Sequence, residues 1–249
     1  MSDIILPKVY SEFLWERSKN PAHRKYIGKQ FLSWSQVETF LSKTGFNTGL
    51  IGEYEYVIRY FSGFKFDDMG WGTFGNECEN YITLKADSDK FTEKEKEVLN
   101  KIKPLGVFQD EILYYIEDLD VVILGYLDDR SPEVDGIVEL LRDYKTKSES
   151  SKKDLHDDKK HQLEIYILGL RQRGLEVKSA EYCIIERFGG KECMMGGGRG
   201  VLSIGEIIWY EPYSWTEERL QQTHDLLVST VKEISALYKV YQNYFGEKK

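Results

Sequence analysis

Two acids and a lysine are expected to meet at one end of a β-hairpin in the middle of the chain. In GYLDDRSPEVDGIVELLRDYKTK one apolar run ends in Asp128 and Asp129, and the next ends in Asp143-Tyr144-Lys145. Side chains alternate along a strand, so Asp143 and Lys145 project from the same face. The spacing therefore sets a carboxylate beside an ammonium. Taken alone, this pattern is most often an exposed cross-strand ion pair that contributes little to stability.

Two neighbouring segments add polar residues to this end of the hairpin. An earlier stretch, ECENYITLKA, has the apolar spacing of a short helix and carries acids. The helix expected after the hairpin holds Gln162 and Tyr166, which share one helix face because they lie four residues apart. Both side chains can therefore point at the same end of the sheet as Asp143 and Lys145.

In this order the polar residues resemble the motifs of the PD-(D/E)XK nucleases, and within them the RecB-like and lambda-exonuclease-like branch. That family's pattern is Gly-x-x-x-His or Gly-x-x-x-Glu, then Gly-x-x-Asp, then (Asp/Glu)-x-Lys, then Gln-x-x-x-Tyr. The matching segments here are Gly75-Asn-Glu-Cys-Glu79, Gly125-Tyr-Leu-Asp128, Asp143-Tyr-Lys145 and Gln162-Leu-Glu-Ile-Tyr166. The resemblance covers about residues 74–174, and LSWSQVETF near the start is similar to the first helix of RecB-like nucleases.

The resemblance implies an α/β fold with a restriction-endonuclease-like core, a central mixed β-sheet flanked by helices. It also implies a metal-dependent DNA nuclease, an exonuclease acting in DNA replication, recombination or repair. Two alternatives stay open: a structure-specific endonuclease, and a catalytically inactive nucleic-acid-binding protein on the same fold. The intact set of Asp128, Asp143 and Lys145 argues against the inactive protein.

The chemistry of phosphodiester hydrolysis agrees with these residue types. A divalent ion polarises the phosphoryl oxygen and activates water, and Mg²⁺ or Mn²⁺ prefers oxygen ligands. The resemblance implies Asp128 and Asp143 as metal ligands. Lys145 would then position the attacking water and stabilise charge on the scissile phosphate. Gln162 and Tyr166 would orient Lys145 or hold the phosphate backbone.

Two further positions belong to the predicted site, and two of its acids have competitors. The carbonyl oxygen of Tyr144 is a plausible third oxygen ligand. Glu79 would be a further metal ligand where RecB-like enzymes usually have His, and Glu77 competes with it; an ordinary exposed helix acid is the alternative for Glu79. Asp129 competes with Asp128, but the Gly-x-x-Asp register favours Asp128.

The overall charge excludes a protein that binds nucleic acid by charge alone. The chain has 249 residues with 34 basic and 42 acidic side chains, a net charge of −8, so its surface as a whole repels polyanions. A DNA strand would need a local basic cleft. Candidate groups are Arg17, Lys19, Arg24 and Lys25, interleaved with Trp15 and Tyr26, together with Lys152, Lys153, Lys159 and Lys160.

Cysteine usage and the first residues favour a cytoplasmic protein. Cys78, Cys183 and Cys193 are too few and too scattered for a disulfide framework or a zinc site. They also exclude the four-cysteine iron–sulfur cluster of many RecB-like relatives. We find no secretory signal, no transmembrane stretch and no nucleotide-binding P-loop. The expected partners are therefore DNA and a separate helicase, recombinase or single-strand-binding protein, with no membrane.

The elements that must position these residues predict one nuclease domain over 1–249. We expect an N-terminal helical part over 1–70, a nuclease core over 71–210 and a C-terminal helix over 211–249. The predicted strands cover 111–116, 121–127, 136–146, 180–188 and 201–210. The predicted helices cover 15–26, 32–41, 77–86 and 161–174, and a last helix begins at a capping box of Ser214 and Glu217. Segments 87–103, 147–160 and 189–200 are predicted connectors, and the apolar stripe of the last helix packs on the sheet or forms a dimer seam.

Overall fold

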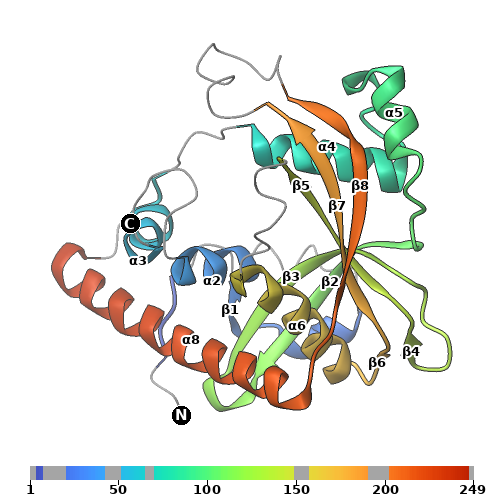
Figure 1. Cartoon of the computed structure of the whole chain (residues 1–249). Helices are drawn as coiled ribbons and strands as arrows, with labels where there is room; N and C mark the ends of the chain where they lie inside the picture. The colour runs from blue at the N-terminus through green and yellow to red at the C-terminus, as the bar shows by residue number, and fades with distance from the viewer. Residues whose placement is uncertain are drawn as a thin grey trace.

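The fold is α/β, with a central mixed β-sheet flanked by helices, as the sequence predicts (Figure 1). The computed structural model describes residues 4–7, 21–42, 52–64, 70–148, 157–189 and 202–246. No helix within these ranges is long and apolar enough to cross a membrane.

The described residues form eight β-strands, six α-helices and four shorter helical turns. The strands are β1 (Gln30–Ser33), β2 (Val107–Ile116), β3 (Val121–Arg130), β4 (Ile137–Val138), β5 (Leu141–Lys147), β6 (Glu176–Val177), β7 (Ala180–Phe188) and β8 (Ser203–Tyr213). The α-helices are α2 (Trp34–Leu41), α3 (Gly52–Tyr56), α4 (Trp71–Leu84), α5 (Glu93–Leu99), α6 (Asp157–Gln172) and α8 (Glu217–Phe245). Shorter helical turns are η1 (Pro21–Tyr26), η2 (Val57–Phe61), η3 (Ser88–Lys90) and η4 (Glu117–Leu119).

Strand β3 has three neighbours, and their arrangement opens the sheet at one point. β2 pairs antiparallel with the whole of β3 along one edge. On the other edge, β1 pairs in parallel with residues 121–124, and β5 pairs antiparallel only with Asp129 and Arg130. Residues 125–128 therefore pair with no described strand on that edge, which leaves Asp128 at a fork between β3 and β5. β7 continues the sheet parallel to β5, and β8 runs antiparallel to β7.

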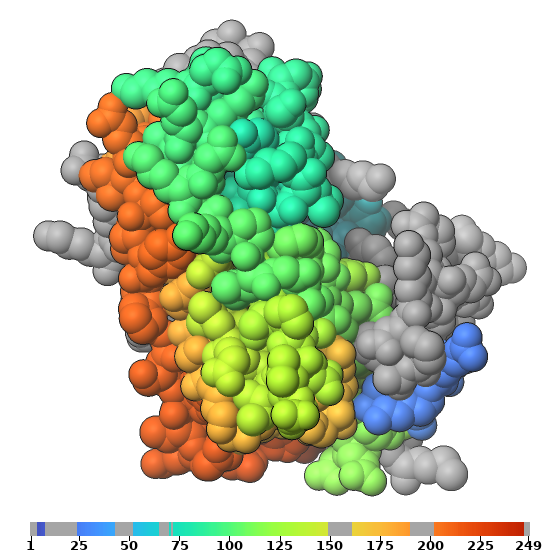
Figure 2. Space-filling view, turned by 90° about the vertical axis from the view of Figure 1, so that its right-hand side faces the viewer, coloured from blue at the N-terminus to red at the C-terminus, as the bar shows by residue number. Residues whose placement is uncertain are grey.

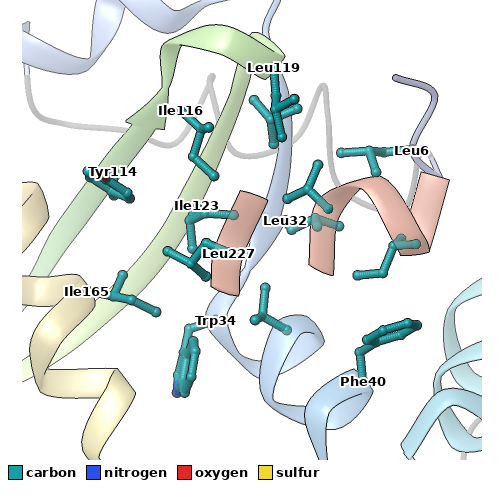
Figure 3. Close-up of a cluster of buried hydrophobic side chains, with 14 of the residues drawn as sticks. Leu6, Leu32, Trp34, Phe40, Tyr114, Ile116, Leu119, Ile123, Ile165 and Leu227 are labelled. Atoms are coloured by element: carbon teal, nitrogen blue, oxygen red, sulfur yellow. The ribbon is translucent and has the colours of Figure 1, made fainter. Parts of the chain in front are cut away.

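The long helix α8 packs on one core of the protein. Leu227, Val231 and Ile234 are at most 1% exposed, and they lie with Trp34 of α2 and Ile123 of β3 in one cluster (Figure 3). Burial of each such side chain stabilises the fold by about 1.5–3 kcal/mol. The apolar stripe of α8 therefore serves the core and not a dimer seam.

Two other apolar clusters hold the helices that border the candidate site. Helix α6 packs through Leu163 and Ile167 on Tyr182 and Ile184 of β7. Helices α4 and α5 pack against β5, β7 and β8 through a second cluster that includes Cys78. Figure 2 shows α4 and α5 in teal and green at the top, beside the orange strand β8.

Helix starts depend on side-chain caps, and one predicted cap is wrong. Ser33 caps α2 in a capping box with Gln36. Helix α8 is capped by Thr216, whose hydroxyl accepts a hydrogen bond from the N–H of Arg219 at 3.1 Å, and not by Ser214. The reason is that Glu217 pairs with Arg171 of α6, with N···O distances of 2.7 and 2.8 Å, and does not fold back on the helix start.

Several predicted elements have other boundaries in the structure. The connector expected over 87–103 contains helix α5, which starts at a capping box of Thr92 and Glu95. The strand expected over 136–146 is divided into β4 and β5. The N-terminal part contributes β1 to the sheet and is not purely helical. Most residues of the loops predicted over 147–160 and 189–200 lie outside the described residues. Residues 15–20 of the first predicted helix lie outside them as well.

Candidate active site

Asp128 and the Asp143-x-Lys145 motif come together at the fork between β3 and β5. The Oδ2 atom of Asp128 accepts a hydrogen bond from the backbone N–H of Tyr144, with an N···O distance of 2.8 Å. This bond crosses from the end of β3 to the middle of β5, where the two strands have ceased to pair. It places the carboxylate of Asp128 against the backbone of Tyr144, the residue between Asp143 and Lys145 in the sequence.

Asp143 is fully buried and forms an ion pair with Lys145. Its side chain is 0% exposed, whereas that of Lys145 is 20% exposed, and the Nζ atom of Lys145 contacts the Oδ2 atom of Asp143. Among the described residues, the Oδ1 atom of Asp143 accepts no hydrogen bond although it is buried. Burial of a carboxylate oxygen without a donor is costly, so Asp143 is the acid of the fork whose burial is least compensated by the described residues.

The electrostatics of the fork are dominated by negative charge. Burial raises the pKa of Asp128 well above its usual value, and the charges of Asp143 and Glu79 raise it further. Burial on its own would lower the pKa of Lys145, but Asp143 and Asp128 raise it overall. Lys145 is therefore a stable cation near neutral pH. One ammonium faces several carboxylates, so the site has an excess of negative charge.

Glu79 reaches this group of acids from helix α4. Burial raises its pKa, and so does the charge of Asp143. The carboxylate of Glu79 accepts a hydrogen bond at Oε1 from the side-chain amide of Gln109 on β2. The predicted first-motif acid thus interacts electrostatically with Asp143 and Asp128, and no sequence motif points to its Gln109 partner.

Asp129, the competitor of Asp128, has a different environment. It is 0% exposed and accepts hydrogen bonds from the N–H groups of Leu105 and Gly106, with N···O distances of 2.8 and 3.2 Å. The hydroxyl of Tyr144 donates a third, at 2.7 Å. Asp129 therefore holds the turn before β2, which leaves Asp128 as the acid at the fork.

Gln162 and Tyr166 lock helix α6 onto strand β3. The amide of Gln162 donates to the hydroxyl of Tyr166 at 2.8 Å, and this hydroxyl donates to the carbonyl oxygen of Tyr126 at 2.6 Å. Burial raises the pKa of Tyr166 well above its usual value, and the charges of Asp143 and Asp128 raise it further. Tyr166 thus stays a neutral donor. Its hydrogen bond fixes the backbone of β3 two residues before Asp128.

Two further residues contribute to this arrangement in ways that sequence analysis did not assign. Gly125 has no room for a side chain, because a Cβ atom there would lie 2.5 Å from Cε1 of Tyr166. Glu38 of α2 adds a further negative charge, which raises the pKa of Lys145 behind the larger influences of burial and the two aspartates. The two motifs that contain Gly125 and Tyr166 could have suggested their contact, whereas the effect of the Glu38 charge on Lys145 has no local signal in the sequence.

The donor set suits a hard divalent cation by its chemistry. Asp128, Asp143 and Glu79 offer only oxygen atoms, which Mg²⁺ and Mn²⁺ prefer, and the buried Oδ1 atom of Asp143 has no donor among the described residues. As the side chains stand, no three Asp, Glu, His or Cys residues in the described ranges surround a common point closely enough to hold a metal ion. The cation that contacts Asp143 is Lys145. The carbonyl of Tyr144 as a further ligand stays a prediction.

The predicted basic and aromatic patch is only partly described. Arg24 and Lys25 of η1 are exposed. Tyr26 is 8% exposed, and its ring packs on Tyr115 with centroids 5.2 Å apart. Tyr26 thus packs within the protein, and DNA binding by Arg24 and Lys25 stays a prediction. Trp15, Arg17, Lys19, Lys152 and Lys153 lie outside the described residues, as do the side chains of Lys159 and Lys160.

Comparisons with known proteins add a distant structural likeness to these observations. No protein-family model matches the chain, and no curated protein matches it. Among solved structures, the chain is similar to the crystal structure of SSO0001, with a TM-score of 0.41 and 12% sequence identity over 88% of this chain and 80% of that one. The function therefore has to be inferred from the residues of the site.

Proposed function

We propose that this protein is a metal-dependent deoxyribonuclease of the PD-(D/E)XK type, which hydrolyses phosphodiester bonds in DNA. The observation that carries the proposal is the fork between β3 and β5. There the carboxylate of Asp128 accepts a hydrogen bond from the backbone N–H of Tyr144, the residue that separates Asp143 from Lys145 in the sequence. Two acids and one lysine are thus held on two strands that diverge at this point.

The residues of the fork divide into those that hold a cation and those that act on the phosphate. Asp128, Asp143 and Glu79 would hold Mg²⁺ or Mn²⁺. When bound, the cation would polarise the scissile phosphate and lower the pKa of a water molecule. Lys145, which keeps its proton, would donate hydrogen bonds to the attacking water or to the charge that develops on the phosphate. Tyr166 would keep β3 and Asp128 in place.

The contact of Lys145 with Asp143 bears on how a cation would enter. The ammonium neutralises the buried carboxylate, and a divalent cation would have to share this carboxylate or displace the ammonium. The same ion pair supports a second candidate, a nucleic-acid-binding protein without catalysis, because Lys145 already provides a cation to the buried carboxylate of Asp143. Cleavage and binding assays on the same sample separate the two candidates.

The exonuclease activity is proposed from the resembled branch, whose members are mostly exonucleases. A test compares end-labelled linear DNA with covalently closed circular DNA of the same sequence, in Mg²⁺, in Mn²⁺ and in a chelator. An exonuclease degrades only the linear DNA, and it needs the metal. Cutting of the circle would replace this activity with an endonuclease. Binding of both DNAs without cleavage in any metal would favour the inactive binding protein.

A further inference from the structure

We propose that Gln109 is a positioning residue for the carboxylate of Glu79. This inference rests on the proposed function and deepens it, because it assigns a role to a residue outside the motifs that the sequence matches. Gln109 lies in β2, the strand that pairs with the whole length of β3. Its neighbours Phe108 and Asp110 pair with Asp129 and Leu127 of β3, which places Gln109 beside Asp128.

The side chain of Gln109 joins the sheet to helix α4 at the candidate site. Its Nε2 atom donates a hydrogen bond to the Oε1 atom of Glu79. Glu79 faces like charges, since Asp143 raises its pKa, and mutual repulsion would drive such a carboxylate away from the aspartates. An uncharged donor that holds one oxygen atom opposes this movement without adding a competing cation.

The backbone of Gln109 supports a specific role for the residue. Its φ angle is +48°, in the left-handed region that residues other than Gly, Asn and Asp seldom adopt. The pairs on both sides of it continue the antiparallel ladder, so the irregularity is confined to this residue. Such strained positions persist where the surroundings hold them in place, and they gather at functional sites.

Removal of the Gln109 amide should change the affinity for the metal more than the stability of the fold. Partners that orient a metal ligand typically change affinity by about 10- to 100-fold when they are removed. Loss of the Gln109 amide should therefore weaken metal binding by about this factor. Cleavage should be recovered by raising the metal concentration, so that the metal concentration for half-maximal rate rises while the maximal rate changes little.

The test measures Mn²⁺ binding to the full chain by titration calorimetry, without DNA. Gln109→Gly removes the amide, and glycine suits the left-handed backbone at this position. Gln109→Leu removes the amide but keeps the strained backbone. Comparison of the two variants separates the effect of the side chain from the effect of the strain. A matched control is Gln221→Leu on α8, because Gln221 also donates an amide hydrogen bond to a carboxylate, that of Asp225, at 2.9 Å. Thermal unfolding of each variant checks that the fold is retained.

We expect both Gln109 variants to bind Mn²⁺ about 10- to 100-fold more weakly than the wild type, and the Gln221 variant to bind it unchanged. Wild-type affinity in Gln109→Gly would overturn the inference and leave the proposed function intact. Failure of the wild type to bind Mn²⁺ at all would overturn the proposed metal site, and the role of Gln109 with it. Glu79→Gln reports on the ligand itself and should weaken binding at least as much as Gln109→Gly.

Discussion

Gly125 of β3 and Tyr166 of α6 pack so closely that a Cβ atom on Gly125 would lie 2.5 Å from Cε1 of Tyr166. Tyr166 then donates its hydroxyl to the carbonyl of Tyr126, the next residue along β3. The glycine of the Gly-x-x-Asp motif and the tyrosine of the Gln-x-x-x-Tyr motif therefore contact each other. Through this contact helix α6 determines where Asp128 lies, which explains why the two motifs occur together.

Gly125→Ala should destabilise the protein, because real Cβ atoms do not approach a ring carbon to 2.5 Å. We expect a loss of about 1–3 kcal/mol, the usual cost of overpacking, in the free energy of unfolding measured with urea. Gly75→Ala is the matched control from another motif, since its Cβ atom would lie 3.9 Å from Oγ1 of Thr146, an ordinary contact. Equal stabilities of the two variants would contradict the close packing of Gly125.

Tyr166→Phe should keep the ring on Gly125 and lose both hydrogen bonds of the hydroxyl. We expect the free energy of unfolding to fall by about 1–3 kcal/mol, because the carbonyl of Tyr126 is left without this donor. Cleavage should decline as β3 loosens near Asp128. Urea unfolding and the cleavage rate of the same preparation check both effects, and an unchanged rate would show that Tyr166 does not position the site.

Asp128→Asn and Asp129→Asn should act on different properties, although the two residues are adjacent. Asp129→Asn weakens a fully buried acceptor of three hydrogen bonds, so we expect lower stability, by about 1–3 kcal/mol. Asp128→Asn should abolish cleavage and leave the melting temperature close to that of the wild type or above it, because it removes one of several repelling charges. A loss of stability in Asp128→Asn together with a loss of cleavage in Asp129→Asn would show that Asp129, and not Asp128, is the acid of the site.

A buried carboxylate away from the site makes folding sensitive to acid. Burial alone would raise the pKa of Glu164, but hydrogen bonds from His161, Thr223, Tyr213 and Arg219 lower it to about 2. Because the folded pKa lies below the unfolded value of about 4.3, the stabilisation is complete above that value and is lost as the pH falls towards 2. The shift corresponds to at most about 3 kcal/mol.

This sensitivity can be measured as the free energy of unfolding between neutral pH and pH 2. The wild type should lose stability on acidification, and protonation of Glu164 should contribute to the loss below about pH 4.3. Glu164→Gln should be less stable at neutral pH and should show a flatter pH dependence. A mutant curve parallel to that of the wild type would refute the assignment.

The sequence predicted those parts of the fold whose signals are local. Short β-branched or aromatic runs indicated β3 and β5, and the ends of these runs predicted that Asp128, Asp143 and Lys145 lie at the same end of the sheet. Helix α5 was missed, although its capping box of Thr92 and Glu95 is a local signal, because its many lysines and glutamates resemble a solvated connector.

Other features could not have been predicted, since they depend on contacts between distant segments. β1 has only four residues and joins the sheet through β3. Gln109 lies 30 residues from Glu79 along the chain, and its left-handed backbone has no signature in the sequence. The hydrogen bonds around Glu164 come from α6, β8 and α8 together, so each residue by itself looks like an ordinary surface group.

The central claim is that Asp143 and Lys145 carry metal-dependent phosphodiester hydrolysis, and the most direct test is cleavage of end-labelled linear DNA. Wild type, Asp143→Asn and Lys145→Ala are compared in Mn²⁺, in Mg²⁺ and in a chelator, with DNA binding and thermal unfolding measured on the same samples. We predict that the wild type cleaves only with metal, and that both variants bind DNA but fail to cleave it. Wild-type cleavage rates in either variant would contradict the account.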